Sequence, residues 1–85
     1  MRLFKAEFIG EDGDDAAHYE GTKHDIHQWV KDSVPKSEWP STKILELEMK
    51  TDKAGILAAL NGEFEPDVIA TFGLTKRGGL EPWQE

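Results

Sequence analysis

Apolar and polar side chains alternate along four stretches of the chain, and this alternation predicts β-strands. In residues 2–9, Phe4, Ala6 and Phe8 fall on one side and the charged residues fall on the other. Such a pattern is typical of a strand with one buried and one wet face. The same alternation predicts further strands at residues 16–20, 43–50 and 67–75. The chain is therefore expected to form a sheet with one apolar face.

The alternation also assigns a face to each residue of the later strands. The residues expected to point inward are Ala17, Tyr19, Leu45, Leu47, Met49, Val68, Ala70, Phe72 and Leu74. Ile44, Glu46 and Glu48 then point outward, because successive side chains of a strand alternate between its faces. His18 is likewise expected on the outward side.

A helical pattern separates the second and third predicted strands. Its apolar residues have the spacing of one helix face, and they are Ile26, Trp29, Val30 and Val34. Thr22 and Asp25 have the spacing of an N-terminal capping box, and Pro35 ends the helix because it lacks an N–H group. Residues 35–41 are expected to form a loop.

A second, short helix is predicted at residues 54–60. Thr51 and Asp52 precede it as caps, and Asn61 and Gly62 follow it as a left-handed C-cap. It is apolar nearly all round, which predicts that it is well buried. Residues 76–79 form a turn, and residues 80–85 are either an edge strand or a flexible tail anchored by its two large apolar residues.

The predicted order is ββαβαβ over residues 1–85, which is a small single α+β domain. We expect a mainly antiparallel four-stranded sheet with two helices on one face. A parallel crossover between the third and fourth strands is an alternative, and the strand order stays open.

Composition limits the function classes. The 85 residues carry a net charge of −7 and include no cysteine. Disulfides, thiolate metal sites and thiol nucleophiles are therefore excluded. No stretch has the roughly 20 consecutive apolar residues of a membrane span, and the expected compartment is the cytoplasm.

Three histidines offer the one candidate metal site: His18 on the second strand and His24 and His27 on the first helix. Asp25 lies between the helical pair, and such a group is stereochemically able to bind zinc or nickel. The helical wheel places His27 beside the apolar stripe and His24 in solvent. A metal- or ligand-binding accessory domain is the alternative hypothesis.

The motifs of catalysis and nucleotide binding are missing from the sequence. No serine stands in a nucleophile elbow, and neither glycine-rich phosphate motif occurs. The acidic loop at residues 11–15 does not match a calcium-binding loop. We therefore expect a protein that is not an enzyme and needs no cofactor.

The remaining candidates point to protein binding. Glu7, Glu20, Glu46 and Glu48 are expected to form a carboxylate lattice on the wet face of the sheet, with Ile44 and Ile69 adding apolar area. The alternative is an ordinary solubilising surface of mixed charge, with Lys5 and Lys43 among the acids. Trp39 and Trp83 each adjoin a proline, and exposed aromatic side chains on stiff segments are frequent anchors of interfaces. The alternative is that the two tryptophans cover the core of this small domain from its edges.

The favoured hypothesis is a non-enzymatic inhibitor or regulator that binds a protein with a basic, nucleic-acid-binding surface. It expects no direct binding to nucleic acid or membrane, and it leaves a homodimer open. Small phage-encoded inhibitors, including those of the anti-CRISPR type, are similar in size, acidic charge and lack of cysteine, but no motif identifies a family.

Overall fold

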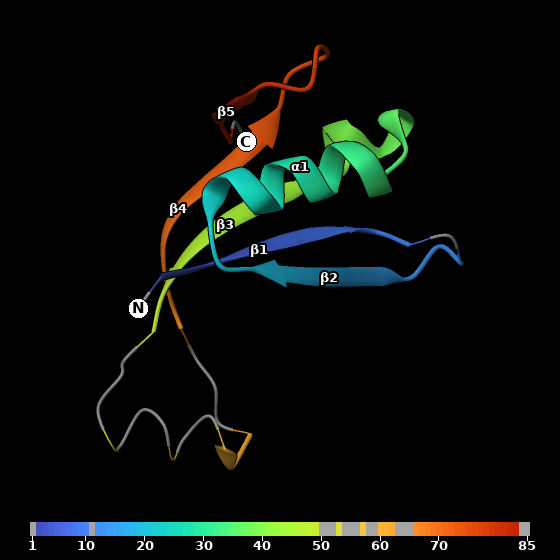
Figure 1. Cartoon of the computed structure of the whole chain (residues 1–85). Coiled ribbons are helices and arrows are strands. Elements are labelled where there is room, and N and C mark those ends of the chain that lie inside the picture. The colour runs from blue at the N-terminus through green and yellow to red at the C-terminus, as the bar shows by residue number, and fades with distance from the viewer. Residues whose placement is uncertain are drawn as a thin grey trace.

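A five-stranded antiparallel sheet carries an α-helix across one of its faces in the computed structural model (Figure 1). The described residues are 2–10, 12–49, 53, 57, 60–62 and 66–83. In chain order the elements are β1 (Arg2–Ile9), β2 (Asp15–Glu20), α1 (Lys23–Ser33), the 3₁₀ helix η1 (Lys36–Ser41), β3 (Lys43–Glu48), β4 (Asp67–Leu74) and β5 (Leu80–Pro82). The α+β class is confirmed.

The strands lie in the order β2-β1-β3-β4-β5. The prediction of four strands was wrong by one, because residues 80–82 take the edge-strand alternative rather than that of a tail. The parallel alternative for β3 and β4 is also wrong, since these strands pair antiparallel. The β5 strand pairs with β4 after a tight turn, in which the N–H of Thr75 donates to the carbonyl of Gly79 at 2.8 Å.

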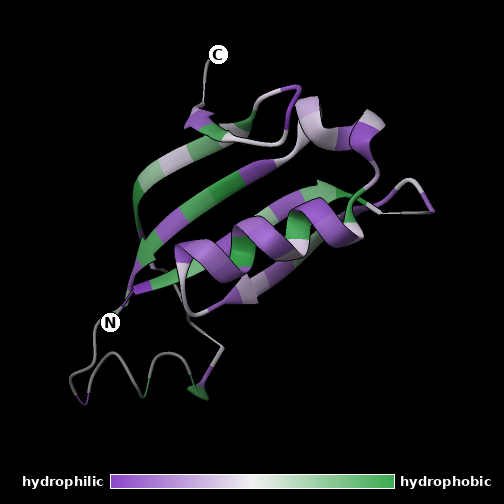
Figure 2. Cartoon of the chain, turned by 45° about the horizontal axis from the view of Figure 1, so that its top comes forward, coloured by the Kyte–Doolittle hydropathy of each residue, from purple (hydrophilic) through white to green (hydrophobic). Residues whose placement is uncertain are grey.

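The core lies between α1 and the sheet, as the apolar bands in Figure 2 illustrate. Ile26 and Val30 of α1 are fully buried, and so are Ala6 of β1 and Ile44 of β3. The small side chain of Ala6 leaves room for the helix to approach the sheet. Burial of apolar surface contributes about 25 cal/mol per Å², so this contact stabilises the packing of α1 on the sheet.

The start of α1 is set by its cap, as predicted. Thr22 is the N-cap, and its side-chain oxygen accepts the N–H of Asp25 at 3.1 Å. The helix ends at Ser33, before Val34 and Pro35. The residues after it were predicted to be a loop, but they form η1, whose Pro40 lies inside the 3₁₀ helix.

The face assignment of β3 was wrong at Ile44 and Leu45, whereas Leu47, which was predicted to be buried, is 2% exposed. Ile44 pairs with Ala6 and is fully buried under α1, whereas Leu45 pairs with Lys5 on the open face. Both sides of β3 carry large aliphatic residues, so alternation alone does not choose between them. The register against β1 decides the question.

The face assignment of β2 was wrong for the same kind of reason. His18 pairs with Ala6 and lies on the helix side, while Tyr19 pairs with Lys5 and is 46% exposed. The imidazole of His18 stacks on Trp29 of α1, with ring centroids 3.9 Å apart. The side chain that packs under α1 is therefore that of His18, although the alternation predicted that of Tyr19.

A register shift divides β4. Phe72 and Leu74 face α1 as predicted, but the pairing of β3 with β4 slips at Glu46 and Leu47. Val68 then pairs with Leu47 on the open side and is 54% exposed. A β-bulge of this kind places one extra residue in one strand, which reverses the alternation beyond it.

The second predicted helix, at residues 54–60, lies largely outside the described residues, and so do its caps at 51 and 52. Leu57 and Leu60 are described and are 48% and 78% exposed, so burial was the wrong prediction for these two. Gly62 has the positive φ expected of a left-handed C-cap, at 78°. Among the described residues, no helix has the length and apolarity that crossing a membrane requires.

The register of β3 predicts unequal effects of truncation at two neighbouring positions. Ile44→Ala is expected to lower the free energy of unfolding by about 2–5 kcal/mol, because it opens a cavity under α1. Leu45→Ala is the matched control on the open face and should have a clearly smaller effect. Urea denaturation of both variants measures the difference, and a larger loss for Leu45→Ala would contradict the observed register.

Candidate binding cleft

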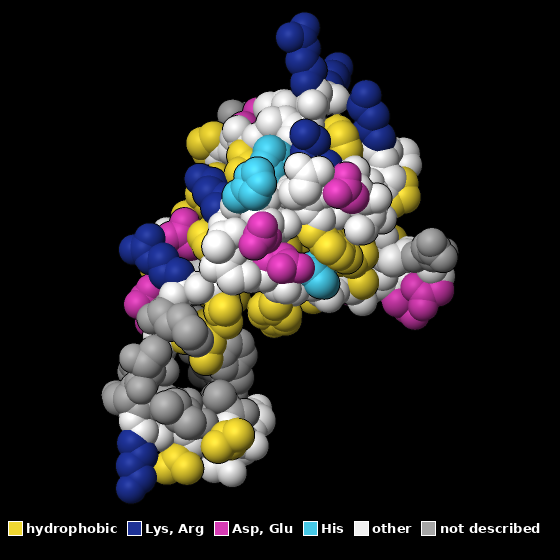
Figure 3. Space-filling model, in the orientation of Figure 1, with side chains coloured by type: hydrophobic (Ala, Val, Ile, Leu, Met, Phe, Trp, Pro, Cys, Tyr) yellow, Lys and Arg dark blue, Asp and Glu magenta, His cyan; other side chains and the backbone are white. Residues whose placement is uncertain are grey.

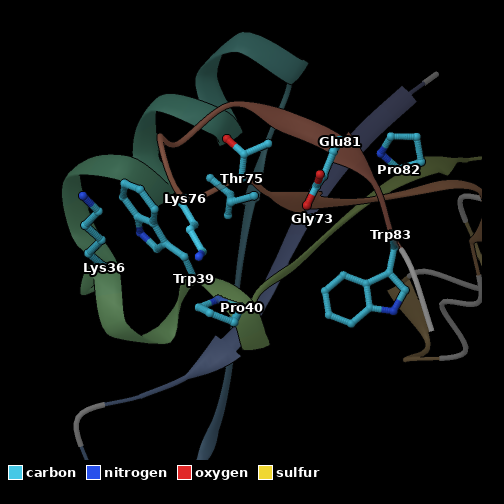
Figure 4. A pocket seen from close by; sticks show the side chains of 10 residues that line it. Lys36, Trp39, Pro40, Gly73, Thr75, Lys76, Glu81, Pro82 and Trp83 are labelled. Atoms are coloured by element: carbon cyan, nitrogen blue, oxygen red, sulfur yellow. The ribbon is translucent and has the colours of Figure 1, made fainter.

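A cleft of about 610 Å³ opens between η1 and the β4–β5 hairpin. We call it the tryptophan cleft, and it is lined by Lys36, Trp39, Pro40, Gly73, Leu74, Thr75, Lys76, Glu81, Pro82 and Trp83. In Figure 4 the two indoles stand apart on either side of Pro40. Volumes of about 300–1,000 Å³ are typical of ligand sites in proteins.

Trp39 forms one wall and is held from two sides. Its indole N–H donates to the carbonyl of Val34 at 3.0 Å, which ties η1 to the end of α1. The far edge of the ring lies against the turn at Gly78, where a Cβ atom would stand 3.2 Å from two ring carbons. Gly78 also has φ at 87°, a conformation that favours glycine. The turn therefore allows the ring to come this close.

A histidine of α1 fixes the same turn. The ring N–H of His27 donates to the carbonyl of Gly78. The turn is thus joined to α1 by a hydrogen bond and to η1 by the contact with Trp39. These contacts set the position of the hairpin that carries Lys76.

Trp83 forms the opposite wall and lies on the open face of the sheet. Its backbone N–H donates to the carbonyl of Thr71 at 3.1 Å, which extends the pairing of β5 with β4. Its ring covers Gly73, where a Cβ atom would meet the ring at 3.1 Å. The ammonium group of Lys43 lies 5.0 Å from the ring centroid, a cation–π distance. An edge of the indole is therefore held against β4 at Gly73.

Cationic side chains gather around the first wall. Lys36 and Lys76 both line the cleft, and the Lys36 ammonium lies 5.9 Å from the centroid of the Trp39 ring. Glu81 is the one acidic residue among the ten that line it. In Figure 3 lysine and arginine side chains cluster at the end of the molecule that carries the β4–β5 hairpin. The cleft is locally basic in a chain whose net charge is −7.

The predicted carboxylate lattice does not form on one face. Glu7 pairs with Lys43 on the open face, whereas Glu20 and Glu46 flank Phe4 on the side of α1. Ile44 adds nothing to this surface because it is buried in the core. The lattice was predicted from face assignments of β2 and β3 that were wrong, so Glu20 and Glu46 lie on the other face of the sheet from Glu7.

The four carboxylates also have partners of their own. Glu46 lies 2.7 Å from a guanidinium nitrogen of Arg2 and is only 14% exposed, and Glu48 lies 3.4 Å from another nitrogen of Arg2. Glu20 accepts a hydrogen bond from His18. Glu7 lies 3.3 Å from the ammonium group of Lys5. These pairings reduce the negative charge that each carboxylate offers to a partner protein.

Lys5 shows the effect of this pairing. Partial burial opposes its charged form, but the hydrogen bond and charge of Glu7, together with Tyr19, outweigh that effect and raise the pKa of Lys5 above its ordinary value. The ammonium group thus stays charged at neutral pH opposite Glu7. The open face carries mixed charge rather than a row of acids.

The three histidines are not brought together. His18 stacks on Trp29, His27 binds the carbonyl of Gly78, and His24 is exposed on α1. Throughout the described ranges, no group of three His, Cys, Asp or Glu side chains is arranged to hold a metal ion. The geometry gives the metal hypothesis no support.

The proline-flanked tryptophans were predicted from the sequence, but the rest of the cleft was not. Gly73 and Gly78 each accept an indole edge, and nothing in a single sequence links them to residues 39 and 83. Lys36 and Lys76 also lie far apart in sequence, although both line the cleft. The register of β4 and β5 brings these parts together.

A methyl group added at Gly73 should displace the indole of Trp83 and leave those of Trp29 and Trp39 in place. Gly73→Ala places a methyl group 3.1 Å from the ring, while the backbone needs no positive φ there. The indole N–H signal of Trp83 in a proton–nitrogen correlation spectrum is expected to shift, with those of Trp29 and Trp39 unchanged. Gly21→Ala is the matched control, because a Cβ atom there meets nothing within 4 Å. An unchanged Trp83 signal would contradict the described wall.

The contact of Trp39 with the turn can be tested by comparing substitutions at two glycines that have nearly the same positive φ. Gly13→Ala and Gly78→Ala both place alanine at positive φ, at 84° and 87°, which costs about 1–2 kcal/mol. Only at Gly78 does the added methyl group also press on Trp39. Thermal unfolding should show the greater loss of stability for Gly78→Ala, and equal losses would show that the Trp39 contact adds nothing.

Comparison with known proteins places this cleft in no established family. The chain matches no protein-family model, no curated protein and no solved structure at a significant level. Its function is therefore argued from the residues of the cleft.

Proposed function

We propose that this chain is a non-enzymatic protein-binding module that holds a peptide segment of its partner in the tryptophan cleft. The observation that carries the proposal is the pair of indoles held on opposite walls of a cleft of about 610 Å³. Tryptophan is the residue type most enriched at energetically dominant interface positions.

Preorganisation supports this function. Trp39 is fixed by its hydrogen bond to Val34, and Trp83 by its position over Gly73. Both indoles are only partly buried, so each keeps ring surface free for a ligand. Binding is weakened by the entropy lost when side chains become ordered, and walls that are already fixed avoid most of that loss.

The composition of the lining favours binding over catalysis. The ten described residues of the cleft include no histidine, serine or cysteine. The hydroxyl of Thr75 already accepts the N–H of Gly79 at 2.9 Å. The ionisable side chains of the lining are those of Lys36, Lys76 and Glu81, and general acid–base chemistry requires such groups within hydrogen-bond reach of the reacting atoms.

The hypothesis of an inhibitor or regulator is kept here with a different binding surface. Its carboxylate lattice is set aside, because Glu7 and Glu46 lie on opposite faces of the sheet. The tryptophan anchors remain as its physical basis. That the partner carries a basic surface elsewhere stays a prediction from the net charge of −7.

Selection from a library of displayed random peptides of about ten residues tests the proposal. Peptides enriched on the wild-type chain are expected to lose about tenfold or more in affinity for Trp83→Ala, equivalent to about 1.4 kcal/mol. Isothermal titration with the synthetic peptides measures this loss.

Tyr19→Ala is the matched control for that selection, because Tyr19 is 46% exposed but is not among the residues of the cleft. Its affinity for the selected peptides should equal that of the wild-type chain. Enriched peptides that bind Trp83→Ala as tightly as wild type, or a library that yields no binder, would reject the cleft as a protein-binding site.

A further inference from the structure

We infer that the peptide held in the tryptophan cleft is an acidic, proline-containing segment in the polyproline II conformation. This inference rests on the proposed function and names the chemistry of its ligand. Three features of the cleft carry it: the charge of its lining, the rings that form its walls and the shape of the sheet edge beside it.

The charge of the lining selects for carboxylates. Lys36 and Lys76 line the cleft against the single acid Glu81. Lys31 approaches the same end of the molecule, since a Cβ atom at Gly78 would lie 3.3 Å from its side chain. The Debye length is about 8 Å at physiological salt, so a ligand inside the cleft is influenced most by the charges that line it, which are two lysines and one glutamate.

The two lysines stand beside Trp39 in the close view (Figure 4). Lys36 begins η1 and Lys76 lies in the β4–β5 turn, so the cations come from segments far apart in sequence. A ligand that lies on the indole thus has ammonium groups within reach. The arrangement suits an apolar segment flanked by carboxylates.

The walls select for proline. Two indoles and the rings of Pro40 and Pro82 line the cleft. Aromatic-lined grooves are the usual receptors of polyproline II segments, whose proline rings pack on the aromatic faces. Such a segment is already extended when free, so it loses little entropy on binding.

The edge of the sheet argues against the other extended mode, in which a peptide adds a strand beside β5. The N–H of Trp83 donates to Thr71 and that of Thr75 donates to Gly79. Hydrogen-bonded pairs alternate along an antiparallel ladder, so the pair of Gly73 and Glu81 between them is also hydrogen-bonded. The backbone of Leu80 and Pro82 therefore points outward.

Of these two outward residues Pro82 has no N–H group, which leaves Leu80 as the single outward donor of β5. An added strand needs a regular row of donors and acceptors, and a proline at an edge is a device that prevents such pairing. A polyproline II segment forms few backbone hydrogen bonds and does not require that row. The edge thus favours side-chain recognition in the cleft.

A nucleic acid strand is the competing anionic ligand for tryptophan and lysine. Single strands also stack on aromatic rings, but they bind in grooves whose positive charge follows the backbone over several nucleotides. Here Glu81 stands in the lining and the whole chain carries a charge of −7. A peptide with few carboxylates fits this field better than a polyphosphate.

Titration with four synthetic probes tests the inference on the wild-type chain. They are the capped peptide EPPLPPE, its counterpart with lysine for each glutamate, its counterpart with alanine for each proline, and oligothymidylate of similar length. Binding is followed through the indole N–H signals of Trp39 and Trp83. EPPLPPE is expected to bind about fivefold or more tightly than each of the other three, and to weaken as salt rises from about 0.05 to 0.5 M.

Variants of the cleft separate charge from ring contacts. The double variant Lys36→Glu, Lys76→Glu should reverse the preference between the glutamate and lysine peptides while the fold is kept, because both ammonium groups are exposed. Lys23→Glu, Lys53→Glu is the matched control with the same change of charge outside the cleft, and it should leave the preference unchanged.

Three outcomes overturn the inference: equal binding of the lysine peptide, equal binding of the alanine peptide, or tighter binding of oligothymidylate. If displayed peptides still depend on Trp83 in those cases, the proposed function stands and the ligand chemistry assigned here is wrong. If neither the probes nor displayed peptides bind in a Trp83-dependent way, both proposals fail together.

Discussion

Burial of the apolar stripe of α1 against Ala6 and Ile44 is the contact on which the rest of this structure depends. It fixes the helix across the sheet, and with it the two points from which the cleft is built. One point is the carbonyl of Val34 at the end of α1, which accepts the N–H of Trp39. The other is His27, which binds the carbonyl of Gly78 in the β4–β5 turn. Loss of the core contact would therefore displace Val34 and His27, and with them both supports that hold Trp39 in place.

In the described part of the molecule, several lysine ammonium groups lie over aromatic rings. Among them are Lys23 over Phe72 at 4.2 Å and Lys43 over Trp83 at 5.0 Å. Such contacts contribute about 0.5–1 kcal/mol each at exposed sites. They also hold ammonium groups next to aromatic surface. The electric potential near these rings is therefore more positive than the net charge of −7 would suggest.

Sequence patterns predicted the elements better than their faces. The alternation in β1 and the capping signal at Thr22 were confirmed, because each depends on contacts within a few residues. The faces of β2 and β3 were reversed, because both strands carry apolar or aromatic groups on each side and pairing with β1 decides which side is buried. The carboxylate lattice failed with them, whereas the proline-flanked tryptophans did reach one common cleft.

The amino-acid sequence by itself determined the α+β class, the position of α1 and the aromatic anchors of the candidate site. These follow from local propensity and periodicity, which act over neighbouring residues. Only the tertiary structure decided which lysines and glycines surround Trp39 and Trp83. Lys36 and Trp39 belong to η1, whereas Gly73, Lys76 and Gly78 belong to the β4–β5 hairpin, and their meeting depends on strand register and on a positive φ at Gly78. Register is a property of paired strands, and a single strand read alone does not contain it.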